Sequence, residues 1–194
     1  MAELFIELFS EEIPSQLQIN ARKEIKSIIE DKLNLKEIKF SISKSYSTPK
    51  RLVFFIDGLP EKIEQKAQNI KGPKVGSPDV ALEGFIKSNR LKKSDIYKKK
   101  LEKGEFFFGN LKPKTINVLN ELELIIPNIF QSYQWKKSMK WSNYELRWAR
   151  PLRSIVAIFN NRVVKFNLFH LISGHLTFID DKIEEKQKTI KNFK

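Results

Sequence analysis

The chain has 194 residues, 41% of them hydrophobic, and a formal net charge of +13, so it is long enough and apolar enough to bury a core. It contains no cysteine, which excludes disulfides, a catalytic thiol and cysteine-ligated metal sites. No apolar run approaches the ~20 residues that span a bilayer, and the first residues include acids where a signal peptide needs basic ones. We therefore expect a soluble, cytoplasmic protein that does not bind a membrane.

The first third of the sequence predicts one helix and three strands. Residues 3–9 form a short apolar run that indicates a buried strand. Leucine, isoleucine and alanine then recur at three- and four-residue spacing, which predicts a helix that starts after Ser10 and ends near Asn34. Alternation over 38–42 predicts a half-exposed strand, and 51–57 predicts another buried strand.

The middle of the chain is more polar. Residues 59–78 contain closely spaced glycines and prolines, which indicates a loop or linker. A short helix is expected to open at 77–79, and a hairpin is expected over 96–111 with its turn at 102–105. A helix should span roughly 115–130, where Pro127 could kink or end it.

The last third predicts a second hairpin over 151–168, which turns at Asn160 and Asn161 because asparagine tolerates positive φ. Residues 180–194 are mostly charged and are expected to form a frayed helix or tail. Taken together, the pattern predicts an α+β fold: a mixed sheet with hairpins packed against two to four helices, and a charged C-terminal tail.

The positive charge is concentrated in two blocks. Residues 86–114 and residues 134–165 each carry a net charge of +7. A surface that binds a polyanion requires such clustering. A lysine-rich composition can also place lysines on any tolerant surface, and the chain has 29 Lys against 7 Arg. The second block is the stronger candidate because it holds four of the seven arginines.

Residues 134–153 combine all three tryptophans with six basic residues. Tryptophan and arginine together are typical of nucleic-acid binding, through stacking and phosphate contacts. They are equally typical of a protein interface, and the tryptophans could also pack in the core. Pro151 argues for an extended segment, in which we expect Arg150 to pair with an acid or with backbone carbonyls.

A search for catalytic groups finds little. No glycine-rich phosphate loop is present. The adjacent acids Glu11 and Glu12 are better explained by electrostatics at a helix start than by catalysis. His170 and His175 are five residues apart, which does not match the spacing of a helical metal pair. We assign no catalytic residue and no metal ligand.

Seven short runs occur in an order that resembles a known family. They are Leu-Phe-Ile-Glu-Leu-Phe-Ser-Glu-Glu-Ile-Pro at 4–14, Thr-Pro-Lys-Arg-Leu at 48–52, Lys-Gly-Pro at 71–73, Gly-Phe with Ser-Asn at 84–89, Lys-Gly-Glu-Phe at 103–106, Lys-Ser-Met-Lys-Trp at 137–141 and Arg-Trp-Ala-Arg-Pro-Leu-Arg at 147–153. Over about 3–178 the chain resembles the N-terminal part of the β subunit of bacterial two-subunit glycyl-tRNA synthetase. Phe9 stands where that family has glycine, and the family's chains are several times longer.

The resemblance implies a function. It assigns residues 1–178 to the N-terminal region of such a β subunit, while the composition indicates a division into two lobes near 59–78 and a charged tail at 179–194. The complete enzyme of that family is a ligase that joins glycine to tRNA with ATP and Mg²⁺, and its chemistry is attributed to the α subunit. We therefore expect a non-catalytic subunit part, inactive alone and binding no cofactor itself, whose partners are the α subunit and tRNA. Two alternatives are a standalone RNA-binding module and a structural or interface fragment of a split or truncated gene.

The candidates for contact with tRNA or the partner subunit are Lys50, Arg51, Lys71, Lys74, Lys136, Lys137, Lys140, Arg147 and Arg153. The candidates for an interface are Trp135, Trp141 and Trp148.

Overall fold

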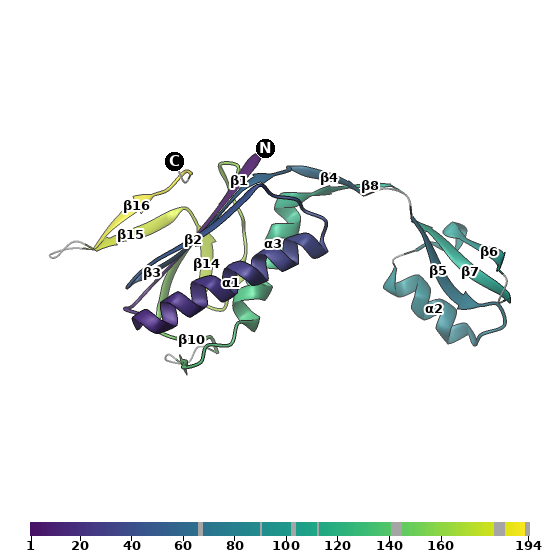
Figure 1. The fold of residues 1–194 in the computed structure, drawn as a ribbon, viewed down its shortest axis with the longest axis horizontal. Coiled ribbons are helices and arrows are strands. Elements are labelled where there is room, and N and C mark those ends of the chain that lie inside the picture. The colour runs from purple at the N-terminus through teal and green to yellow at the C-terminus, as the bar shows by residue number, and fades with distance from the viewer. Residues whose placement is uncertain are drawn as a thin grey trace. The chain divides into compact units, whose positions relative to one another are not determined.

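A computed structural model describes residues 1–65, 68–89, 91–101, 104–111, 113–140, 145–180 and 185–192. The chain divides into two compact units, both drawn in Figure 1. Unit 1 comprises residues 1–63 and 117–194, and unit 2 comprises residues 64–116. The paired strands β4 (Lys62–Gln65) and β8 (Lys114–Asn117) carry the chain out of unit 1 and back.

Unit 1 is built on a seven-stranded sheet in the order β13-β14-β11-β1-β3-β2, with β12 paired to β11. Its elements are β1 (Ala2–Ser10), α1 (Ser15–Leu35), β2 (Ile42–Thr48), β3 (Arg51–Leu59), α3 (Val118–Ser132), β9 (Met139–Lys140), β10 (Arg147–Trp148), β11 (Leu152–Phe159), β12 (Arg162–Val163), β13 (Asn167–Leu168), β14 (Leu171–Gly174), β15 (Leu176–Asp180) and β16 (Glu185–Thr189). The β11–β14 pair is parallel and the other ladders of this sheet are antiparallel.

Unit 2 is a three-stranded antiparallel sheet with one helix. Its elements are β5 (Gln68–Lys74), α2 (Asp79–Ser88), a 3₁₀ turn (Lys93–Asp95), β6 (Ile96–Leu101) and β7 (Gly104–Leu111), with the strand order β5-β7-β6. The three α-helices described in the two units and the mixed sheet of unit 1 confirm the predicted α+β class.

The core of unit 1 lies between the sheet and the helices α1 and α3. Leu4, Ile6 and Leu8 of β1 point into it, together with the apolar stripe of α1 that the periodicity predicted. The opposite face of β1 is also buried, because Phe5 packs with Val156 and Ile158 of β11. Burial on both faces explains why residues 3–9 are apolar almost throughout.

Helix α1 ends as predicted, but the next strand begins later than expected. The amide of Glu37 donates to the Asn34 carbonyl at 2.9 Å, and the amide of Ile38 donates to the Leu33 carbonyl at 2.9 Å. With a φ of 58° at Glu37, this is a Schellman motif. Ile38 is therefore buried as part of the helix stop, and β2 begins only at Ile42.

The expected loop at 59–78 is wrong in part, because β4 and β5 lie within it. Pro73 is tolerated in β5 because the register between β5 and β7 shifts between Lys71 and Lys74. The predicted hairpin over 96–111 is confirmed by the β6–β7 ladder. Part of its turn, residues 102–103, lies outside the described residues.

Pro127 lies inside α3 and does not end it. The turn at Asn160 and Asn161 is confirmed, with φ values of 47° and 61°. Residues 185–189 form the strand β16 paired with β15, not a frayed helix or tail.

Candidate nucleic-acid interface

Basic residues of 136–140 and Arg147 lie on or next to a short two-stranded ladder of unit 1. Strands β9 and β10 pair so that Lys140 lies opposite Arg147 and Met139 lies opposite Trp148. Lys136, Lys137, Lys140 and Arg147 are all exposed. The four cations that the sequence singled out in this segment are thus brought together at the surface of unit 1.

The pairing of Lys140 with Arg147 places two positive charges directly opposite each other, which does not stabilise a β-ladder. Directly opposed residues of an antiparallel pair share a face, and like charges there repel. An anion bound between the two strands would remove this repulsion. The pair therefore places two like charges side by side on the surface of unit 1.

The tryptophans hold this segment to the core. Trp148 is 0% exposed and Trp135 is 8% exposed. Their ring centroids lie 5.0 Å apart in an edge-on arrangement, and Phe130 of α3 packs edge-on to Trp148 at 6.3 Å. Trp135 and Trp148 therefore pack in the core of unit 1, which is one of the three roles that the sequence left open for the tryptophans. Trp141 lies outside the described residues.

Alternation along β10 connects the core to the basic surface. Because Trp148 points into the core, its neighbour Arg147 must point outward. The sequence pattern alone leaves this undecided, since tryptophan and arginine are both common at interfaces. Burial of the indole thus fixes the direction in which the guanidinium group is presented.

Arg51 and Arg153 occupy a different place, beside aromatic rings on the sheet. Arg51 lies 4.6 Å from the centroid of the Phe9 ring, and Arg153 lies 5.2 Å from the centroid of Phe178. The rings of Phe9 and Phe178 stack with centroids 5.6 Å apart. Phe9 is thus the centre of a cation–π cluster.

A buried carboxylate completes this cluster. Glu7 is 6% exposed, accepts a hydrogen bond from the Thr177 hydroxyl and lies 3.5 Å from Nε of Arg51. Arg51 also donates to the Phe178 carbonyl. A buried charge needs such partners to offset its desolvation. Arg51 therefore ties β3 to β1 and to the β15 strand, a structural role that the sequence did not indicate.

The arginines near Pro151 also have partners within the chain. Nε of Arg150 donates to the Glu12 carbonyl at 3.0 Å, which confirms the expected pairing with backbone. Nη1 of Arg153 lies 3.4 Å from the Glu11 carboxylate. The Glu11 carboxylate and the Glu12 main-chain carbonyl thus join the segment before α1 to Arg153 of β11 and to Arg150 just before it.

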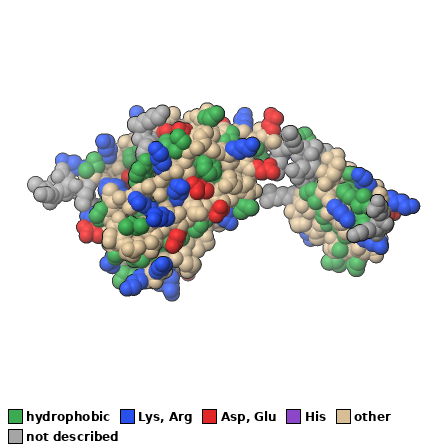
Figure 2. All heavy atoms as spheres, in the orientation of Figure 1, with side chains coloured by type: hydrophobic (Ala, Val, Ile, Leu, Met, Phe, Trp, Pro, Cys, Tyr) green, Lys and Arg blue, Asp and Glu red, His purple; other side chains and the backbone are tan. Residues whose placement is uncertain are grey.

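The remaining basic candidates are dispersed. Lys50 is half-buried in the turn between β2 and β3. Lys71 and Lys74 are exposed on β5 and belong to unit 2. Figure 2 shows Lys and Arg side chains spread over the visible face of unit 1 with Asp and Glu among them, so that face is not a continuous basic patch.

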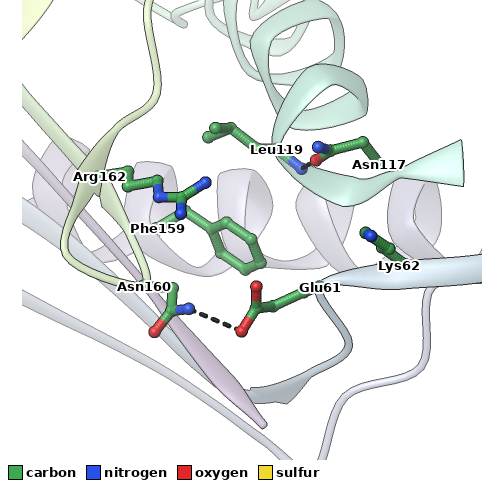
Figure 3. Close-up of a pocket in the computed structure, with 7 residues that line it drawn as sticks. All are labelled: Glu61, Lys62, Asn117, Leu119, Phe159, Asn160 and Arg162. Carbon is green, nitrogen blue, oxygen red and sulfur yellow. Dashed lines mark hydrogen bonds between the residues drawn. The ribbon is translucent and has the colours of Figure 1, made fainter.

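A polar pocket that sequence analysis missed lies where β4, α3 and the β11–β12 turn meet. Figure 3 shows that Glu61 and Asn160 point toward each other, and Nδ2 of Asn160 donates to Glu61 at 2.8 Å. Lys62 and Arg162 also line it. Glu61 additionally accepts the Val118 amide through its carbonyl at 3.0 Å. These bonds join distant parts of unit 1, and the mixed charges do not match an acid–base pair or a phosphate cradle.

Among the residues that the structure describes, no group of three or more His, Cys, Asp and Glu side chains could hold a metal ion. No helix formed by the described residues has both the length and the apolar character required to cross a membrane.

Tyr133 of unit 1 has a perturbed pKa. Burial of the Tyr133 ring, together with the hydrogen bond that its hydroxyl donates to Glu24 at 2.7 Å, raises the pKa of Tyr133. Its ring packs edge-on against Trp135 with a centroid distance of 5.2 Å. Tyr133 therefore links the tryptophan cluster to α1.

A family model described as "Glycyl-tRNA synthetase beta subunit" matches residues 4–194. The chain belongs to the glycyl-tRNA synthetase beta subunit family. This confirms the resemblance seen in the sequence.

Individual members of the glycyl-tRNA synthetase beta subunit family agree. The chain is 34% identical to the "Glycine--tRNA ligase beta subunit" of Rhodospirillum centenum over 84% of its length, and 34% identical to that of Rickettsia typhi over 92%. It is 32% identical to that of Rickettsia bellii over 100% of its length. These matches cover 23%, 27% and 29% of the relatives, so the chain spans about a quarter of their length.

The motifs that resemble the glycyl-tRNA synthetase beta subunit family fall in both units. Residues 48–52 form the turn from β2 into β3, and residues 71–73 lie in β5. Residues 147–153 lead from the basic ladder into the central strand β11. The resemblance therefore runs through the basic ladder, the main sheet and unit 2.

Proposed function

We propose that this chain is the N-terminal part of a glycine–tRNA ligase β subunit that supports ATP-dependent glycylation of tRNA by contacting tRNA and the α subunit in the cytoplasm. The family match over residues 4–194 carries the proposal. The ligase chemistry, with its ATP and Mg²⁺, is assigned to the rest of the enzyme, because the chain offers binding surfaces and no recognised nucleotide-binding motif.

We assign the tRNA contact in unit 1 to the cations around β9 and β10. Lys140 and Arg147 oppose each other on this ladder, and Lys136 and Lys137 are exposed just before it. Phosphate contacts position a protein on a nucleic acid without reading its bases. Such a surface suits a subunit that orients tRNA for a partner that carries out the reaction.

The test uses the enzyme assembled from the chain and the α subunit. The Lys140→Ala, Arg147→Ala double variant should bind tRNA more weakly, and its slope of log K against log salt should fall by about 2, one for each phosphate contact. The matched control removes two exposed lysines of α1, Lys23→Ala with Lys32→Ala, and should leave the slope nearly unchanged. Equal slopes for the two double variants would contradict the assignment.

Two outcomes separate the parts of the proposal. Loss of α-subunit binding with unchanged tRNA affinity would make the ladder a subunit interface and not a tRNA contact. The purified chain alone should show no glycine-dependent ATP–pyrophosphate exchange. Such exchange would overturn the non-catalytic role.

A further inference from the structure

The sheet of unit 2 has one face covered by its own helix. A Cβ atom added to Gly72 of β5 would lie 2.8 Å from the ring of Phe85 on α2. A Cβ added to Gly109 of β7 would lie 2.3 Å from the side chain of Leu91, which is buried. These glycines show how closely α2 and the segment that follows it approach this side of the sheet.

The other face combines aromatic rings with lysines. Directly opposed residues share a face, and so do alternate residues of one strand. Phe108 lies opposite Tyr97 of β6 and Lys71 of β5. Two residues along, Phe106 lies opposite Lys99 and Lys74. The face defined by Lys71, Lys74, Tyr97, Lys99, Phe106 and Phe108 is called here the aromatic–lysine face.

The side chains of the aromatic–lysine face are accessible. Tyr97 is 38% exposed, and the three lysines are exposed while the two phenylalanines are half-buried. The ammonium of Lys71 lies 3.8 Å from the Phe106 centroid, and the rings of Tyr97 and Phe108 stack at 5.9 Å. Unit 2 has 13 basic and 6 acidic residues, a net charge of +7.

We propose that the aromatic–lysine face binds unpaired RNA nucleotides, with bases stacked on the rings of Tyr97, Phe106 and Phe108 and phosphates held by the lysines. Proteins bind single strands with little sequence preference when aromatic rings stack on the bases and positive charges contact the phosphates. The positive charge of unit 2 complements a nucleic acid strand. That the unpaired nucleotides belong to tRNA rests on the proposed function.

A stacked base can displace a lysine ammonium from the face of an aromatic ring. A cation–π contact at an exposed site is weaker than the stacking of a base on an aromatic side chain. A base that takes the place of the Lys71 ammonium over Phe106 therefore gains stacking energy. It also releases the ammonium to contact the phosphate of the same nucleotide.

The test measures the binding of a labelled eight-nucleotide single-stranded RNA to the full chain by fluorescence anisotropy. The Phe106→Leu, Phe108→Leu variant keeps apolar bulk but loses both rings, and it should bind at least about tenfold more weakly. The matched control is Phe107→Leu, one residue along the same strand and on the covered face, which should bind like the native chain. Equal affinities for the double variant and the control would overturn the proposal.

The lysines give a second, independent readout. Lys71→Ala with Lys99→Ala should lower the salt slope by about 1.4, since each single-strand phosphate contact contributes about 0.7. The control, Lys98→Ala with Lys100→Ala, removes two charges from the opposite face of β6 and should change the slope less. Equal changes in the two variants would overturn the assignment of phosphates to this face.

Further outcomes keep the test decisive. If the double phenylalanine variant does not fold, as judged by circular dichroism, Tyr97→Leu removes one exposed ring and should still weaken binding. Equal affinity for a duplex of the same length, or loss of α-subunit binding with unchanged RNA affinity, would overturn the proposal. In either case the Lys140→Ala, Arg147→Ala variant should still bind tRNA more weakly than the native chain. Failure of the proposal for the aromatic–lysine face can therefore be distinguished from failure of the proposed function.

Discussion

Replacing Trp148 tests whether the tryptophans stabilise the fold or serve an interface. The indole of Trp148 is fully buried against Trp135 and Phe130. Truncation of a buried tryptophan to alanine costs about 3–5 kcal/mol, because the transfer energy of the ring is lost and a cavity remains. Two edge-on aromatic pairs are lost as well, each contributing about 0.5–1.5 kcal/mol beyond its area. Trp148→Ala should therefore lie at the upper end of that range.

The assay is urea unfolding followed by far-ultraviolet circular dichroism, which does not depend on the fluorophore that is removed. Domains of this kind lose about 1–3 kcal/mol of stability per molar urea. The unfolding midpoint of Trp148→Ala should therefore fall by more than about 1 M. Since total stabilities are about 5–15 kcal/mol, a large share of the native stability of unit 1 would be lost.

The control is Trp148→Phe. No hydrogen-bond partner of the Trp148 indole nitrogen lies among the described residues, so phenylalanine forfeits volume but no known hydrogen bond. Its midpoint should fall much less than that of Trp148→Ala. If Trp148→Ala has the same urea midpoint as the native chain yet no longer binds the α subunit, then Trp148 is an interface residue and the packing argument is refuted.

Three further predictions concern other contacts of unit 1. The folded state holds the Tyr133 hydroxyl proton more tightly than the unfolded state, so the contribution of Tyr133 to stability is fully present below the ordinary tyrosine pKa of about 10 and is lost at higher pH. The melting temperature of Tyr133→Phe should therefore fall less steeply above that pH than the melting temperature of the native chain. Equal slopes for the two proteins would contradict this prediction. Gly58→Ala should lower the free energy of unfolding by about 1–3 kcal/mol, because Gly58 has a φ of 80° and an added Cβ would lie 2.9 Å from the Ser41 amide nitrogen. An unchanged urea midpoint would refute this prediction. Asn161→Val should cost about 1–2 kcal/mol and Asn161→Gly should cost nothing, because the φ of Asn161 is 61°; calorimetry that finds both equally stable would count against the turn geometry.

Local physical rules account for the elements that could be predicted. The apolar spacing in α1 reports one buried face, which any helix of that sequence must cover. Asn160 and Asn161 specify a tight turn because asparagine accepts the positive φ that the turn requires. The seven ordered motifs were sufficient to indicate the family, because their order reflects common descent and needs no structure.

Contacts between distant residues decided the rest. Residues 68–74 and 185–189 are strands only because β7 and β15 supply their partners, and local glycine, proline and charge signals cannot show such pairing. Arg51 resembles a free cation in the sequence, but its role depends on Glu7, which lies 44 residues away and is buried beside it.

The same limit applies to the candidate sites. The sequence by itself determined the family, the α+β class and the enrichment of positive charge in two blocks. The tertiary structure alone decided that Trp148 faces the core and Arg147 faces outward, and that Phe106 and Phe108 share a face with Lys71. The reason is that composition sets how many apolar and charged groups exist, whereas strand register and packing set the direction in which each one points.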